Sequence, residues 1–223
     1  MKTVDYVPGR SADLFGSPSD PTVLLWHGMQ TDSRAALTPL AEAIACHRLA
    51  VVVPDWNSHA ADGGRADLLG SAAFARGNAT NANDLVVVGW SMGGLAAAGL
   101  TIHSTAADLR VGHTVCLAGA FTATDPISGG SLEEGLGAGP TGAFTLLHGL
   151  HDDVVPVTVS TTFALLLGEY GWPAEVVELD ADHGSIAGAR YDATEDRYAP
   201  SDDPATLGVA RDVAERIAIV AGR

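Results

Sequence analysis

Short apolar runs alternate along this chain with longer segments that are rich in alanine and leucine. The runs carry few polar residues, and they cover 22–28, 49–56, 84–91, 114–121, 143–149 and 174–184. All but the last are nearly continuous, which is typical of strands that are buried on both faces. Strands with one face in water alternate apolar and polar residues instead. The pattern therefore favours a sheet that is covered on both sides.

Helical segments lie between these runs. Apolar spacing and end signals predict helices over 32–48, 66–77, 92–106, 156–171 and 205–222. A strand followed by a helix, repeated along a chain, indicates a mostly parallel sheet with helices on both faces. We expect an α/β fold of about six to seven strands. No linker or repeat divides the chain, so we expect a single domain over 1–223.

Two long segments, 122–142 and 185–204, show neither helical nor strand periodicity. Loops of this length in a compact domain are usually functional or mobile. Both segments are too short to form a separate cap domain. The glycine-rich segment 122–142 is open to two interpretations, a flap over a site or an ordinary surface loop.

The charge balance excludes some classes of partner. The chain has 12 Lys and Arg against 27 Asp and Glu, a net charge of −15, so it lacks the basic surface that nucleic acids and anionic membranes require. Its first residues contain no apolar stretch of signal-peptide length, and no window approaches a membrane span. We therefore expect a cytoplasmic protein with a small-molecule partner.

Polar and small residues gather where the predicted strands end, and in open parallel sheets ligands bind at the carboxyl ends of the strands. The run 84–91 leads into GWSMG, residues 89–93. This sequence fits the G-x-S-x-G turn that exposes a serine, here Ser91, between a strand and a helix. The same glycines also suit a close helix–sheet contact with an idle serine. The local pattern leaves both interpretations open.

Later strand ends supply the partners that a serine nucleophile needs. Asp152 and Asp153 follow the run 143–149, and His183 lies at the end of the last run. A serine hydroxyl needs a base to take its proton, and a carboxylate to orient the imidazole and stabilise its charged form. The chain order Ser, Asp, His is the one that hydrolases with this turn have. An idle serine predicts no such partners.

Residues 22–185 resemble the α/β-hydrolase family, and more narrowly its small, cap-less members that are similar to dienelactone hydrolases and carboxylesterases. The matching motifs are LLWHGM, GWSMGG, HGLHDDVVP and DADHG, in the family's order. Dienelactone hydrolases have a cysteine nucleophile where this chain has Ser91, so the resemblance does not extend to that activity. Residues 1–21 are too short for the family's usual pair of leading strands, and we expect the sheet to be trimmed there.

The resemblance implies a role for each matching side chain. Ser91 is the nucleophile and His183 is the base. Asp152 is the third member, with Asp153 in the next slot and Asp125, after the run 114–121, as alternatives.

The resemblance also assigns the oxyanion hole to backbone groups. The N–H groups of Met29 and Met92 hold the negative charge of the tetrahedral intermediate. The dipole of the helix that begins at Met92 acts on the same charge.

A substrate pocket lined by Trp56, Trp90, Phe121 and Val155, beside Met29, is one interpretation of the apolar residues near these motifs. Ordinary core packing is the other.

Two further histidines, His27 and His148, are interpreted as structural groups bonded to nearby backbone. The adjacent residues 151–153 do not have the spacing of a metal site, so we expect no metal and no cofactor.

We expect a serine hydrolase that cleaves carboxylic esters of short or medium acyl chain through an acyl-enzyme. A thioesterase, a lactone or amide hydrolase and a perhydrolase share the same triad, and the sequence does not separate them. A non-catalytic domain that binds a small ligand in the same pocket is a further alternative.

Overall fold

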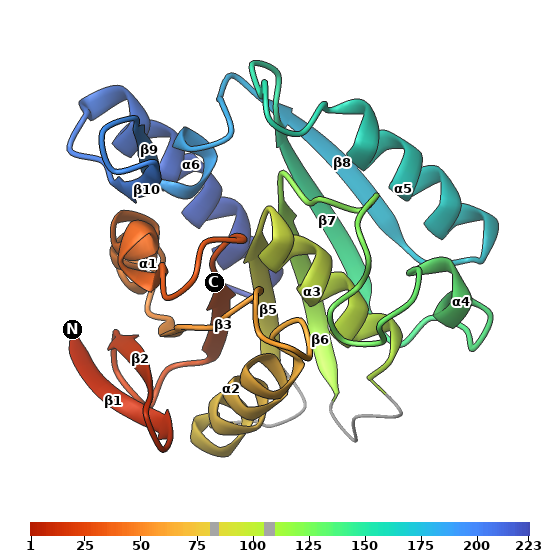
Figure 1. The fold of residues 1–223 in the computed structure, drawn as a ribbon, viewed down its shortest axis with the longest axis horizontal. Coiled ribbons are helices and arrows are strands. Elements are labelled where there is room, and N and C mark those ends of the chain that lie inside the picture. Colours follow the sequence, from red (N-terminus) through yellow and green to blue (C-terminus); the bar gives the residue numbers. More distant parts are fainter. Residues whose placement is uncertain (81–84, 105–109) are drawn as a thin grey trace.

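The structure is a computed structural model that describes residues 1–80, 85–104 and 110–223. Its central feature is an eight-stranded sheet in the order β1-β2-β4-β3-β5-β6-β7-β8 (Figure 1). The strands are β1 (Lys2–Val7), β2 (Arg10–Phe15), β3 (Thr22–Trp26), β4 (Ala50–Pro54), β5 (Leu85–Trp90), β6 (Val111–Leu117), β7 (Ala143–Gly149) and β8 (Ala174–Leu179). Position 84 of the run predicted over 84–91 lies outside the described residues.

The sheet is mostly parallel, as predicted. The pairs β1–β2 and β2–β4 are antiparallel, and the remaining pairs of the sheet are parallel. β3 lies between β4 and β5, so the strand order reverses there. In open sheets of this kind, ligands bind at the carboxyl ends of the strands beside such a reversal.

The helices fall close to the predicted ranges. They are the 3-10 turn η1 (Arg34–Leu37), α1 (Thr38–Ala45), α2 (Arg65–Asn78), α3 (Met92–Ile102), the single turn α4 (Glu133–Leu136), α5 (Thr158–Glu169), the 3-10 turn η2 (Ser185–Ala187) and α6 (Pro204–Val220). Positions 105 and 106 of the helix predicted over 92–106 lie outside the described residues. None of the helices in the described ranges is both long and apolar enough to cross a membrane.

Neighbouring residues of the central strands face different cores, which explains their continuous apolar runs. In β3, Val23 and Leu25 pack in the core that contains residues of α1 and α6. Leu24 and Trp26 pack on the other face with residues of α2 and α3. A third cluster joins α5 to β7 through Phe163 and other apolar residues. Helices thus cover both faces, and Figure 1 shows α1 and α6 on one side and α2 and α3 on the other.

The expectation of a trimmed sheet is wrong, because residues 1–21 form the two leading strands. β1 and β2 have six residues each and are joined by a two-residue turn in which Gly9 adopts a φ of 77°. Most side chains of β1 are exposed or half-buried. A strand at a wet sheet edge has no continuous apolar run, so the pattern that identified the buried strands missed this pair.

The segment 185–204 is also more regular than expected. After η2 it forms a separate hairpin of β9 (Ala189–Asp192) and β10 (Arg197–Pro200). Its strands have only four residues each, which is too short for a reliable alternation in sequence. The segment 122–142 has only the turn α4 as regular structure.

Candidate active site

Ser91 stands on a sharp turn between β5 and α3. Its φ is 57° and its ψ is −118°, a backbone conformation that non-glycine residues rarely adopt. The turn requires small neighbours, since a Cβ on Gly89 would lie 1.9 Å from the Gly93 carbonyl oxygen. A Cβ on Gly93 would lie 2.4 Å from the carbonyl oxygen of His27. The glycines therefore allow both the turn and the close approach of β3, and the two interpretations of this motif are compatible.

His183 follows β8 and is bonded to Asp152, which follows β7. The Nδ1–H of His183 donates to Oδ2 of Asp152 over 2.7 Å. Both side chains are almost completely buried, at 4% and 0% exposure. Because Nδ1 holds the proton, Nε2 is the atom that remains able to accept one.

The second carboxylate oxygen of Asp152 is held by its own loop. Oδ1 accepts from the backbone N–H groups of Val154 and Val155 at 2.9 and 2.8 Å. Burial alone raises the pKa of Asp152, but hydrogen bonds from His148, His183 and Val155 outweigh it and hold the pKa well below its ordinary value. Asp152 is therefore a carboxylate that can stabilise a charged imidazole.

Trp90 links the serine turn to the histidine loop. Its indole Nε1–H donates to the carbonyl oxygen of His183 over 2.7 Å, and the two rings lie 5.4 Å apart. Because Trp90 immediately precedes Ser91, this bond joins the backbone of the nucleophile candidate to that of the base candidate. The interpretation from sequence places Trp90 in a pocket wall instead.

The two alternative acids occupy other environments. Asp153 is exposed and faces solvent beside Asp152. Asp125 is buried, but its oxygens accept from the N–H groups of Ile127 and Ser128 and from the Ser128 hydroxyl. Among the three aspartates, Asp152 is the one bonded to His183.

The loop after β3 lies close to Ser91. A Cβ on Gly28 would lie 3.3 Å from Cβ of Ser91, so the two backbones run close together. Met92 is the first residue of α3, and the N–H of a first helical residue has no acceptor within its helix. Met29 itself is 54% exposed.

The buried His27 ring bonds this loop to the loop after β4. Its Nδ1–H donates to the Gly28 carbonyl over 2.9 Å, and its Nε2 accepts from the Trp56 N–H over 3.1 Å. Complete burial lowers the pKa of His27 to about 4, so the ring is neutral at pH 7, as an accepting Nε2 requires. His148 is likewise buried and bonds to the Val155 carbonyl.

The predicted pocket residues divide into two groups. Trp56 and Trp90 are 0% and 2% exposed, so neither forms a wall of an open pocket. Trp56 instead stacks on His27 and donates to the carbonyl of the same residue over 3.0 Å. Phe121 and Val155 are half-buried, and Phe121 stacks on Phe163 at 4.1 Å. Large apolar residues favour both a core and a pocket, and only the packing distinguishes them.

Two residues near the site were not foreseen from the sequence. Gln30 bonds to the β9–β10 hairpin, and the ring of Tyr198 lies 5.9 Å from that of His183. Burial and nearby carboxylates raise the pKa of Tyr198 to about 12, which keeps its phenol protonated. Gln30 directly follows Met29, which is the one signal that pointed to it.

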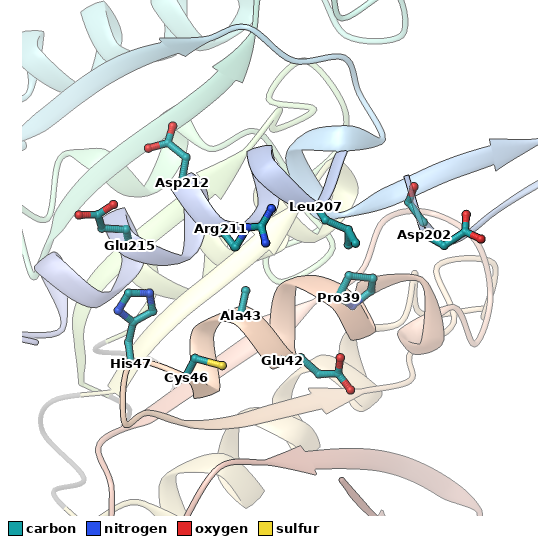
Figure 2. A pocket seen from close by; sticks show the side chains of 11 residues that line it. Pro39, Glu42, Ala43, Cys46, His47, Asp202, Leu207, Arg211, Asp212 and Glu215 are labelled. Atoms are coloured by element: carbon teal, nitrogen blue, oxygen red, sulfur yellow. The ribbon is translucent and has the colours of Figure 1, made fainter. Parts of the chain in front are cut away.

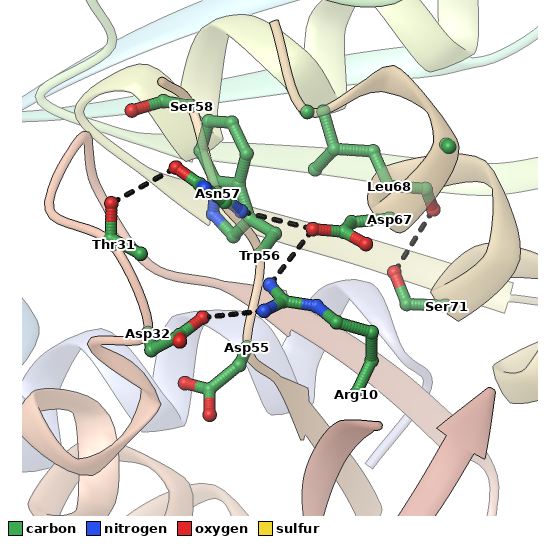
Figure 3. Close-up of polar contacts among 12 residues, drawn as sticks. Arg10, Thr31, Asp32, Asp55, Trp56, Asn57, Ser58, Asp67, Leu68 and Ser71 are labelled. Atoms are coloured by element: carbon green, nitrogen blue, oxygen red, sulfur yellow. Dashed lines mark hydrogen bonds and ion pairs between the residues drawn. The ribbon is translucent and has the colours of Figure 1, made fainter. Parts of the chain in front are cut away.

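A polar network fixes the loops after β3 and β4 (Figure 3). Arg10 forms ion pairs with Asp32 and Asp67, each at 2.8 Å. Thr31 donates to the Asn57 side chain over 3.0 Å. The network thus attaches one side of the loop after β3 to β2 and α2.

Two cavities differ in their relation to this site. One, of about 430 Å³, is lined by His183, Asp153, Tyr191 and Tyr198 among others, and therefore adjoins the histidine. The other, of about 780 Å³, lies between α1 and α6 and is lined by residues such as Cys46 and Arg211 (Figure 2). Its lining includes no triad candidate. Within the described ranges, no group of three or more His, Cys, Asp or Glu side chains is arranged to hold a metal ion.

The sequence matches no family model and no curated protein. Solved structures that are similar include an esterase from the Planctomycetes species Thermogutta terrifontis, Est2. Its propionate-bound form is 15% identical over 98% of this chain and 93% of that chain, with a TM-score of 0.73. The butyrate-bound form is 14% identical over 98% and 93%, with a TM-score of 0.72. The form phosphorylated by paraoxon is 18% identical over 97% and 94%, with a TM-score of 0.70. At such identity, the likeness establishes the fold of the chain.

Proposed function

We propose that this α/β-hydrolase fold carries a serine hydrolase that cleaves carboxylic esters, with Ser91, His183 and Asp152 as its triad. The observation that carries the proposal is the 2.7 Å bond between Asp152 and His183, next to a strained serine turn. The Trp90 bond to the His183 carbonyl ties these two parts of the site together. Similarity to an esterase with propionate- and butyrate-bound structures supports the same reaction class.

The first half of the reaction forms an acyl-enzyme. Nε2 of His183 takes the proton of the Ser91 hydroxyl while Oγ bonds to the ester carbonyl carbon, and the carbonyl oxygen becomes an oxyanion. The N–H groups of Met29 and Met92 stabilise this oxyanion. When the tetrahedral intermediate collapses, the bond to the alkoxide breaks and His183 gives its proton to the leaving alcohol.

The second half repeats these steps with water. His183 takes a proton from water as the water oxygen attacks the acyl carbon. The bond to Ser91 then breaks, the acid leaves and the proton returns to Oγ. In both halves the ionised Asp152 stabilises the imidazolium, which fits the low pKa of this carboxyl.

No cap domain covers the site within residues 1–80, 85–104 and 110–223, so we propose short or medium acyl groups as substrates. The segment 122–142 packs only in part, with Leu132 and Leu136 in the cluster beside α5. An ester and thioester panel of increasing chain length separates an esterase from a thioesterase on the same triad.

The direct test is Ser91→Ala with p-nitrophenyl acetate and butyrate. We expect hydrolysis to fall to the background rate, because no other group replaces the nucleophile. Paraoxon provides an independent measure: the wild type should form a Ser91–phosphoryl bond with release of p-nitrophenolate, detected by peptide mass spectrometry. Ser131→Ala, at an exposed serine of the 122–142 segment, is the control and should match the wild type. Equal activity of wild type and Ser91→Ala would refute the proposal. A wild type that neither hydrolyses the p-nitrophenyl esters nor reacts with paraoxon would favour a non-catalytic binding domain.

A further inference from the structure

The side chain of Gln30 bridges two segments that lie more than 160 residues apart. Its Nε2–H donates to the Asp196 carbonyl over 3.1 Å, and its Oε1 accepts from the Tyr198 N–H over 2.8 Å. The amide thus pairs with the open edge of β10 as a neighbouring strand would. Gln30 directly follows Met29, the proposed oxyanion donor, so this pairing attaches the loop 27–33 to the hairpin. We call this loop between β3 and η1 the oxyanion loop.

The same hairpin contacts the serine turn and the histidine loop through the ring of Tyr198. This ring meets that of Trp90 edge-on, at 4.8 Å and 88°, and lies 5.9 Å from the His183 ring. A Cβ on Gly184 would lie 3.1 Å from the Tyr198 ring, so there is little free space between them. Tyr198 therefore contacts both residues that flank the proposed proton transfer, Trp90 before Ser91 and Gly184 after His183.

The hairpin is well suited to hold these parts in place. Tyr198 is paired with Tyr191 across it, and their rings lie 5.4 Å apart. The Tyr191 hydroxyl bonds to the Asp196 carboxylate, which fixes the turn. At its base, the Ser201 N–H donates to the Gly188 carbonyl over 3.0 Å. The hairpin is thus closed by its own contacts at both ends.

The polar network of Arg10 and Asp32 holds the oxyanion loop on the side of β2 and α2. Gln30 holds it on the side that carries His183. An oxyanion donor acts only if it lies within hydrogen-bond distance of the developing charge. Without the Gln30 bridge, the loop keeps its ion pairs on the side of β2 and α2 but loses the two hydrogen bonds that attach the residue after Met29 to the hairpin.

We propose that Gln30 and Tyr198 are positioning residues. Through the β9–β10 hairpin they hold the oxyanion loop at a fixed position relative to Ser91 and His183. This inference rests on the proposed function. It predicts a defect in transition-state stabilisation rather than in substrate binding, since neither residue is proposed to touch the reacting atoms.

The test is Gln30→Met, which keeps the length of the side chain and removes both hydrogen bonds. We expect kcat to fall about 10- to 100-fold with KM within about threefold, because small displacements of a catalytic group cost rates of this order. A trifluoromethyl ketone, which forms a tetrahedral adduct with an oxyanion, should bind more weakly by the same factor as kcat/KM. The acid limb of the pH profile should be unchanged. A purely structural role would lower the melting temperature and leave the kinetics of the folded enzyme unaltered.

The matched control is Asn78→Leu, which removes an amide that donates to a backbone carbonyl on α2. It should keep wild-type kinetics. Tyr198→Leu and Tyr198→Phe form a second pair: loss of the ring should lower kcat, and the phenylalanine variant should restore it to within about threefold.

Each outcome decides a different claim. A folded Gln30→Met enzyme with unchanged kcat and inhibitor affinity overturns the inference and leaves the proposed function intact. If Gln30→Met does not fold, as judged by circular dichroism, the Tyr198 pair decides, and equal rates for its two variants overturn the inference. If Ser91→Ala keeps wild-type activity, the proposed function and this inference fail together.

Discussion

Two neighbouring loops place a buried aspartate at the same edge of the sheet, and they use it differently. Asp152 follows β7 and Asp125 follows β6, and both carboxyl groups have no exposed surface. Each accepts backbone N–H groups two and three residues ahead, an arrangement that orders the turn. Up to this point the two loops are alike.

The loops differ in the remaining bond of the second oxygen. In Asp152 this oxygen accepts from His183 over 2.7 Å, whereas in Asp125 it accepts from the hydroxyl of Ser128 over 2.7 Å. The nearest histidine to Asp125, His103, is 3.8 Å away. Burial and turn geometry therefore do not identify a triad acid. The feature that distinguishes the proposed triad acid is an oxygen bonded to a histidine whose backbone is in turn bonded to Trp90 of the serine turn.

The strongest way to break this comparison is to change each carboxylate to an amide. Asp152→Asn should lower kcat by about 10⁴-fold, because the amide favours the wrong histidine tautomer and does not stabilise the imidazolium. Asp125→Asn should leave kcat within about threefold. Steady-state hydrolysis of p-nitrophenyl butyrate measures both. A comparable loss in the two variants would show that Asp125 also belongs to the catalytic machinery.

Truncation of the same residues should reverse the order of effects on stability. Asp125→Ala leaves the N–H of buried Ile127 and two groups of Ser128 without their acceptor, and we expect the free energy of unfolding to fall by about 2–4 kcal/mol. Asp152→Ala removes the acceptor of the more exposed Val154 and Val155 and of the His183 ring, but the imidazole can move its proton to Nε2, so this change should cost less. Urea denaturation of both variants measures the difference. If Asp152→Ala lowers the free energy of unfolding more than Asp125→Ala does, Asp152 rather than Asp125 is the more important residue for stability, and the prediction is wrong.

The smallest expected effect is the pH dependence of the free energy of unfolding that the ionisation of Asp152 causes. The folded-state pKa of Asp152 lies below its ordinary value of 3.8, so its charged form stabilises the fold above about pH 4 and this contribution is lost as the pH falls through the folded-state pKa. The difference in unfolding free energy between wild type and Asp152→Asn should therefore not narrow between pH 7 and about 4, and should shrink below that range. Urea titrations at a series of pH values test this. A difference that narrows between pH 7 and 5 contradicts the low pKa.

The central part of the fold could be predicted because it depends on local patterns. Runs buried on both faces, as in β3 and β5, need apolar residues at every position and are visible in sequence. The leading hairpin β1–β2 was missed because it needs apolar residues at only a few positions. The β9–β10 hairpin was missed because its strands have only four residues each, too few for a visible alternation.

The site shows the same division. The glycines around Ser91 and the order of the strand-end motifs are local, and they led to Ser91, Asp152 and His183 as candidates. Trp56 and Trp90 were interpreted as pocket walls because a large apolar side chain suits a core and a pocket equally well. Their burial, and the hydrogen bonds that their indoles make to the His27 and His183 carbonyls, depend on the packing of separate loops.

The sequence by itself determined the class of sheet, the sharp turn at Ser91 and the types of side chain at the strand ends, since each depends on short-range sterics and on which faces must be apolar. Only the tertiary structure decided which aspartate bonds to His183 and which tryptophans bond to the backbone of neighbouring loops. It also decided how Gln30 joins the oxyanion loop to the hairpin. Those contacts join residues 29 to 168 positions apart. Directional hydrogen bonds over such separations exist only once the chain has packed.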